Sequence, residues 1–186
     1  MLRPKTLIAT VLVLFCSSVV LRLAAVTVND LRNDPQLTPE RIGSYFANFD
    51  FEFRSQVQRP EVFLAAKSGD CDDYATLAAD VLKQKGYTPH LVTVRMKKVV
   101  HVVCYIEETK SYLDFNKRHE AVCTVPSDGS LTDIAQQVAR SYRTTWTSVS
   151  EFTYEDGIKR LVATSVNNSP APKEQRLADA LVARSR

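Results

Sequence analysis

Residues 68–87 read SGDCDDYATLAADVLKQKGY, and this stretch decides how the neighbouring segments must fold. Apolar residues recur through it at helical spacing, namely at Ala75, Leu77, Ala78, Val81 and Leu82. Gly86 ends the pattern, as glycine commonly does just past a helix. The sequence therefore predicts a buried helix that begins at Cys71, with Asp70 and Asp72 on either side of the thiol.

The position of Cys71 suggests chemistry. The first turn of a helix lies at the positive end of the helix dipole, which lowers a thiol pKa and favours the thiolate. The carboxylates of Asp70 and Asp72 oppose that effect, so a neighbouring imidazolium is needed to stabilise the thiolate. We expect these two aspartates to cap the helix through its backbone N–H groups. Cys71 is a candidate nucleophile, and the alternative is a buried structural thiol.

A second candidate group lies downstream. His101 interrupts the apolar segment VVHVVCYIE, and Asp114 interrupts SYLDFN. If the two segments are neighbouring strands, both side chains can face the same side of a sheet. An aspartate beside a histidine fixes its tautomer and stabilises the imidazolium. With Cys71 the set would be a nucleophile, a base and an orienting group; Asn116 is the rival orienting group, and a buried histidine satisfied by other partners is the alternative for His101.

The segments around this helix predict an α+β domain. Two short helices precede it: one begins after Thr38, and the other begins at Pro60 and ends at Gly69. Residues 26–35 are expected to be a linker. The later segments predict two antiparallel strands, a third strand, a helix and an edge strand, at 88–96, 99–107, 110–117, 131–142 and 144–157. Helices followed by a run of antiparallel strands indicate α+β rather than a βαβ array.

The 186 residues suffice for one domain, which we expect at residues 36–162, followed by a polar tail at 163–186. Residues 1–25 carry a basic start and an uncharged, mostly apolar run, which is the layout of a secretory signal. An uncleaved membrane anchor is the open alternative. We therefore expect an exported protein: periplasmic, secreted or anchored in a membrane and facing outward.

Charge and cysteine content exclude several classes. The basic residues Arg3, Lys5 and Arg22 account for the whole net charge of +3, so the rest shows no basic footprint for nucleic acid. Beyond the apolar N-terminal run, the cysteines are Cys71, Cys104 and Cys123, an odd number that fits one free reactive thiol in an oxidising compartment. The latter two can pair or be small buried residues. No metal-ligand cluster is evident, and no metal or organic cofactor is implied.

The segments GDCDDYATLAADVLKQKGY and YLDFN, with His101 between them, resemble the transglutaminase-like superfamily. They are most similar to its bacterial cysteine proteinases, over roughly residues 60–116. The resemblance implies a papain-like core in which the cysteine-bearing helix packs on an antiparallel sheet. It also implies Cys71 as nucleophile, His101 as general base and acid, and Asp114 as orienting group. The implied reaction is thiol attack on an amide to give a thioester, resolved by water or an amine.

One departure concerns the oxyanion donor. Relatives often have a tryptophan before the proline that precedes the cysteine motif, whereas this chain reads SQVQRP at 55–60. Gln58, or alternatively Gln56, is the candidate donor here. The resemblance implies a thiol hydrolase or acyltransferase with a peptide or protein substrate. The alternatives are an inactive binding or scaffold module at the cell envelope and, third, an arylamine acyltransferase.

Overall fold

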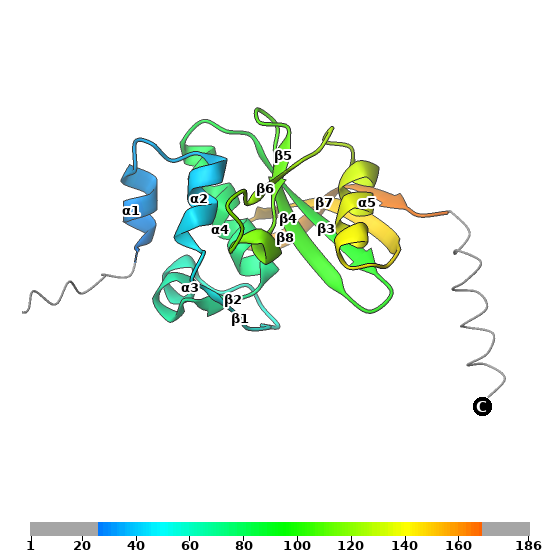
Figure 1. The fold of residues 1–186 in the computed structure, drawn as a ribbon, viewed down its shortest axis with the longest axis horizontal. Coiled ribbons are helices and arrows are strands. Elements are labelled where there is room, and N and C mark those ends of the chain that lie inside the picture. The colour runs from blue at the N-terminus through cyan, green and yellow to red at the C-terminus, as the bar shows by residue number, and fades with distance from the viewer. Residues whose placement is uncertain (1–25, 169–186) are drawn as a thin grey trace, which may run out of the picture.

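The computed structural model describes residues 26–168. Within this range six strands form one antiparallel sheet in the order β6-β5-β4-β3-β7-β8 (Figure 1). These strands are β3 (Pro89–Met96), β4 (Val100–Ile106), β5 (Ser111–Leu113), β6 (Thr124–Pro126), β7 (Trp146–Glu155) and β8 (Ile158–Val166). Two further short strands, β1 (Asp50–Phe51) and β2 (Ser68–Gly69), pair in parallel. The expected α+β class is confirmed.

Helices cover both faces of the sheet. They are α1 (Val28–Asn33), α2 (Pro39–Tyr45), α3 (Pro60–Ala66), α4 (Cys71–Gln84), the 3₁₀ helix η1 (Phe115–Lys117) and α5 (Leu131–Ser141). Helix α4 packs on β3 and β4, and the helices α1, α2 and α3 pack against α4. Helix α5 packs on β3 and β7. In Figure 1 the sheet separates α4 from α5.

The alternation of side chains along the strands builds two hydrophobic cores. Successive residues of a strand point to opposite faces, so Leu91 packs with the α4 side and Val92 with the α5 side. The same alternation places Cys104 with the first core and Val103 with the second. The predicted cysteine-bearing helix is therefore confirmed as a buried element packed on an antiparallel sheet.

Several boundaries differ from the sequence prediction. The expected linker is wrong, because Val28–Asn33 forms α1, opened by a capping box between Thr27 and Asp30. Gly69 does not end α3, since the helix stops at Ala66 and Lys67 takes the left-handed conformation with φ 51°. The third strand is shorter than expected, and Asp114 is the N-cap of η1 instead of a strand residue.

The end of the sheet differs most. The strand expected at the edge, β7, lies between β3 and β8, so β8 is the edge strand. β8 runs to Val166 and thus continues past the boundary expected after residue 162. The expected N-terminal signal or anchor, 1–25, and most of the expected tail lie outside the described residues. Among residues 26–168 no helix is long and apolar enough to span a membrane.

Candidate active site

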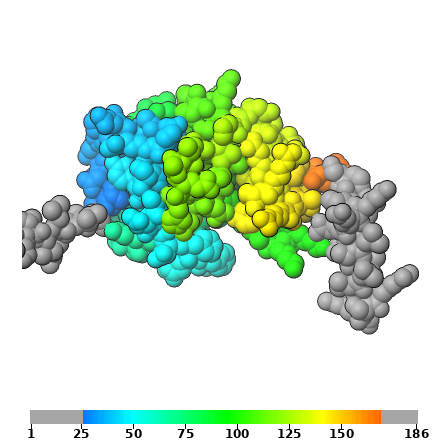
Figure 2. Space-filling view, viewed as in Figure 1, coloured from blue at the N-terminus to red at the C-terminus, as the bar shows by residue number. Residues whose placement is uncertain are grey.

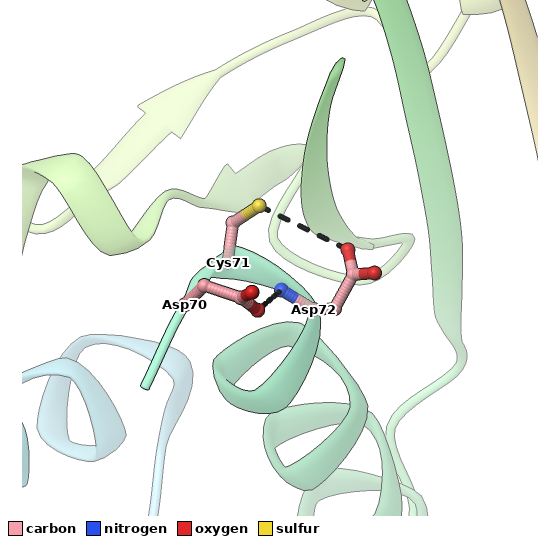
Figure 3. A group of neighbouring side chains, drawn as sticks. All are labelled: Asp70, Cys71 and Asp72. Carbon is pink, nitrogen blue, oxygen red and sulfur yellow. Dashed lines mark hydrogen bonds between the residues drawn. The ribbon is translucent and has the colours of Figure 1, made fainter. Parts of the chain in front are cut away.

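Cys71 is the first residue of α4 and is half-buried. The Asp70 carboxylate caps the helix by accepting the Asp72 backbone N–H at 3.0 Å, and Asp73 completes a capping box by accepting the Asp70 N–H at 3.0 Å. Figure 3 shows the Cys71 sulfur and the Asp72 carboxylate on one side of the helix start, 3.8 Å apart. Asp70 therefore has the expected capping role, whereas the second capping side chain is that of Asp73 and not that of Asp72.

His101 and Asp114 form a buried pair. Strand β5 ends at Leu113, so the chain turns at Asp114 beside the first residues of β4. His101 Nε2 lies 2.8 Å from Asp114 Oδ1, and each residue is only 2% exposed. The Asn116 backbone N–H also donates to Asp114 Oδ1 at 2.9 Å. The proximity expected from the two strand segments is thus confirmed.

The electrostatics of this pair favour a charged imidazole. Burial lowers the pKa of His101, but hydrogen bonds to Asp114 and to Cys71 outweigh burial and raise the pKa to about 10. Burial raises the pKa of Asp114, yet the hydrogen bond and charge of His101 leave that pKa below its usual value. At neutral pH the pair is therefore an imidazolium and a carboxylate. The hydrogen bond with Cys71 that raises the His101 pKa means that the thiol lies beside the same ring. Cys71, His101 and Asp114 are therefore neighbours.

Asp72 has a cationic neighbour that the sequence did not indicate. Burial raises the pKa of Asp72, with a further contribution from Asp70, while the charge of Lys159 acts in the opposite direction. Lys159 comes from β8; its Nζ donates to Thr93 Oγ1 at 3.2 Å and lies 3.6 Å from the centre of the Phe152 ring. The charge of Lys159 also acts on Cys71. The edge hairpin thus supplies a positive charge near the thiol.

The side-chain amide of Gln58 is hydrogen-bonded to groups other than the thiol. Its amide nitrogen donates to Ser68 O at 3.1 Å and to Asp73 Oδ2 at 2.8 Å, so both amide hydrogens are used. Its backbone N–H donates to Asp73 Oδ1 at 2.6 Å. Gln58 therefore holds the segment before α3 against the start of α4 in this conformation, which leaves no amide hydrogen for an oxyanion. The Cys71 N–H, as the first of the helix, has no intrahelical acceptor and remains a candidate donor.

Tyr142 is a site residue that sequence reasoning missed. The sequence predicted only that it ends the helix at 131–142, but its hydroxyl oxygen lies 3.1 Å from His101 Nδ1. Asn116 Nδ2 donates to the same oxygen at 2.6 Å. Asn116 therefore contacts Tyr142 and not His101 through its side chain, which leaves Asp114 as the group paired with the imidazole. Tyr142 also borders a hollow of about 370 Å³ with Met96 and Val99.

The other histidines and cysteines among residues 26–168 have other partners or surroundings. His90 pairs with Glu151 at 2.7 Å, and His119 bonds the carbonyl of Ala47. The cysteines within residues 26–168 are all free thiols, and Cys104 is fully buried, which raises its pKa strongly.

One group within the described part of the chain has metal-ligand spacing. The ligand atoms of Asp70, Cys71 and Asp72 lie within 4.8 Å of one another. Asp70 already accepts two backbone N–H groups, from Asp72 and from Arg54. Its carboxylate is therefore committed to holding the helix start.

A family model described as the transglutaminase-like domain matches residues 23–124, more than half of the chain. The chain belongs to this transglutaminase-like family. The family expected from the sequence is confirmed, and the triad candidates lie within the matched residues. No curated protein matches the chain.

The domain is similar to solved bacterial structures. Calcium-bound LapG from Legionella pneumophila is 17% identical over 86% of this chain and 85% of that chain, with a TM-score of 0.47. A structure described as a putative cysteine protease from Cytophaga hutchinsonii is 12% identical over 72% of this chain, with a TM-score of 0.32. The chain covers 46% of that second protein's length.

Proposed function

We propose that this chain is a thiol hydrolase or acyltransferase that attacks peptide amide bonds through Cys71, His101 and Asp114. The observation that carries the proposal is the buried imidazole of His101. It bonds Asp114 through Nε2 at 2.8 Å, and a second hydrogen bond, to the Cys71 thiol, also raises its pKa. A buried histidine bound on one side by a carboxylate and on the other by a helix-headed cysteine is the arrangement that nucleophilic thiol chemistry needs.

The proposed reaction begins with the thiol proton on His101 and a thiolate on Cys71. The sulfur adds to the amide carbonyl carbon, and the carbonyl electrons move to oxygen. As the C–N bond breaks, His101 Nδ1 gives its proton to the leaving amine and a thioester remains on Cys71. Water, deprotonated by His101, then adds to the thioester carbon, and the C–S bond breaks to release the acid and return the Cys71 thiolate; an amine in place of water gives a new amide by the same step. Asp114 stays ionised and stabilises the imidazolium throughout.

The developing oxyanion would accept the Cys71 backbone N–H at the positive end of α4. A second donor is not supplied by Gln58, whose amide hydrogens are bound to Ser68 and Asp73. This is the one observation that favours an alternative, a non-catalytic binding module of the same fold at the cell envelope. The two proposals differ at Cys71: a binding module keeps its partner in Cys71→Ala, whereas an enzyme loses turnover.

The setting of the activity is also a proposal. We propose that residues 1–25 are a signal or membrane anchor, that 36–162 carry the catalytic domain, and that the domain works outside the cytoplasm on peptide or protein substrates. The basic, then apolar start of the chain supports export. The charge balance of the remaining residues supports a substrate other than nucleic acid.

The test is to incubate the full chain and Cys71→Ala with a mixture of folded and denatured proteins and to identify new termini by mass spectrometry. The proposal expects new N-termini with the wild type alone. An isotopically labelled primary amine in the mixture would be incorporated if an amine resolves the thioester. If neither new termini nor amine incorporation exceeds the level seen with Cys71→Ala, the hydrolase and transferase proposals both fail.

A further inference from the structure

Tyr142 approaches the triad from the side of the sheet opposite α4. It is the C-cap residue of α5, and its ring centre lies 5.3 Å from the His101 ring centre with the planes at 60°. The hydroxyl oxygen is 3.1 Å from His101 Nδ1. Since Nε2 is held by Asp114 at 2.8 Å, Nδ1 is the nitrogen left to exchange a proton with Cys71. The hydroxyl therefore lies against the nitrogen that does the proposed chemistry.

We propose that Tyr142, held by Asn116, is a positioning residue that keeps His101 Nδ1 aligned with Cys71 in both protonation states of the imidazole. The inference rests on the proposed function, because it assigns a role to Tyr142 in the same site. Tyr142 acts through His101, and no contact of its hydroxyl with a substrate is invoked.

A hydroxyl suits this role because it has one hydrogen to donate and two lone pairs to accept with. Asn116 Nδ2 donates to the oxygen at 2.6 Å and so occupies one lone pair. When the imidazole of His101 is neutral and Nδ1 carries no proton, the tyrosine O–H can donate to that nitrogen. When His101 is an imidazolium, the hydroxyl oxygen can accept part of the Nδ1–H that also faces sulfur. Rotation of the Tyr142 hydroxyl about its C–O bond therefore keeps the imidazole ring of His101 in place while the proton moves between Nδ1 and sulfur.

Asn116 links the two partners of the imidazole. Its backbone N–H donates to Asp114 Oδ1 at 2.9 Å, and its side chain donates to the Tyr142 oxygen. One residue of η1 thereby fixes both hydrogen-bonding partners that flank the ring. Burial raises the pKa of Tyr142, so the hydroxyl keeps its proton at neutral pH. The titratable groups that face His101 are Asp114 after β5, Cys71 on α4 and Tyr142 at the end of α5.

The experiment measures the rate of Cys71 alkylation by iodoacetamide from pH 4 to 9 in the full chain. Tyr142→Phe keeps the ring and removes the hydroxyl. We expect alkylation near pH 6 to slow about tenfold, the scale of one hydrogen bond to a charged group, and the midpoint of the profile to move to higher pH. Asn116→Ala should shift the profile in the same direction by less. The matched control is Tyr105→Phe. Tyr105 lies on the same sheet, but its hydroxyl is next to Gly129, so its removal should leave the profile unchanged.

Nitrogen-15 NMR of the histidine rings gives a readout that a packing role would not move. In wild type the His101 Nδ1 resonance should differ from that in Tyr142→Phe, while the Nε2 resonance, bound to Asp114, stays close to its wild-type position. An unchanged alkylation profile with an unchanged Nδ1 resonance in Tyr142→Phe would overturn the inference and leave the proposed function standing. A wild-type profile that is unaffected by His101→Ala would overturn the proposed function itself.

Discussion

At the scale of single residues, the site depends on how charges surround one thiol. Cys71 lies between two aspartates that have different partners. Asp70 accepts backbone N–H groups, whereas burial raises the pKa of Asp72 and the positive charge of Lys159 opposes that rise. The imidazolium of His101 faces the sulfur from the third side. The negative charges beside the cysteine are therefore compensated locally, which is compatible with the proposed role of Cys71 as a nucleophile.

Asp114→Asn should slow Cys71 alkylation at pH 6 by a factor on the order of 10 to 100. The amide keeps the shape but removes the charge that stabilises the imidazolium, and a buried hydrogen bond to a charged group is worth about 1.5–3 kcal/mol. The alkylation rate across pH measures this directly. The control is Asp128→Asn, which changes an exposed carboxylate in the loop before α5 and should match the wild type. Equal rates for Asp114→Asn and wild type would remove Asp114 from the site.

Lys159→Met should also slow alkylation below pH 7, by several-fold, because Asp72 then loses the cation that opposes its effect on the thiolate. Methionine keeps most of the apolar stem of the side chain but lacks the Nζ that lies over the Phe152 ring. Lys159→Arg retains the charge and should recover most of the rate. If methionine and arginine variants react alike, the charge of Lys159 does not act on Cys71.

At the scale of elements, Asp73 connects the start of α4 to the segment before α3. It accepts the Asp70 N–H that starts α4, and it accepts both the backbone N–H and the side-chain amide of Gln58. Gly69 is required beside it, since a Cβ there would come within 2.7 Å of the Phe63 ring and 2.8 Å of the Gln58 amide. This glycine therefore allows a close approach, a role that its position after an apolar run did not reveal.

Asp73→Ala should lower the free energy of unfolding by about 2–4 kcal/mol, because it removes a helix-capping group and leaves buried donors without an acceptor. Urea unfolding followed by circular dichroism gives the value. The control is Asp80→Ala on the same helix, whose exposed ion pair with Arg32 should contribute less than about 1 kcal/mol. Similar losses for the two variants would contradict the structural role of Asp73.

The sequence predicted α4, β3, β4 and α5 because their apolar periodicity is strong, and it predicted the pairing of His101 with Asp114 because polar residues interrupted two apolar strands. It missed β8, whose apolar residues Leu161 and Val162 are exposed, so no buried face marked the strand. The Asp156-Gly157 turn before β8 was a usable hairpin signal. Tyr142 and Lys159 could not have been found, since only the tertiary fold brings them to the site.

At the scale of the whole molecule, the buried pair links protonation to stability. The pKa of His101 is about 10 in the folded state against 6.5 for the free group, so its contribution is complete below pH 6.5 and is lost as the pH rises toward 10. The pKa of Asp114 is lowered, so its contribution is present above pH 3.8 and is lost as the pH falls further. Maximal stability from this pair therefore lies between about pH 4 and 6.5.

The free energy of unfolding, measured by urea titration at pH 5, 7 and 9, should fall across this series by a few kcal/mol, in proportion to the pKa difference of His101. In His101→Ala that decline should be much smaller. A wild-type stability that rises from pH 5 to 9 would mean that His101 is not held as an imidazolium in the fold.

We propose that Cys71 and His101 form a reactive pair, and the decisive measurement is the iodoacetamide alkylation rate of Cys71 from pH 4 to 9. Peptide mass spectrometry distinguishes Cys71 from the other thiols, and His101→Ala is compared with the wild type. A reactive pair gives fast labelling well below the free thiol pKa of about 8.5, and His101→Ala loses it. Slow labelling in both proteins, rising only above pH 8, would show that Cys71 is an ordinary thiol that is not paired with His101.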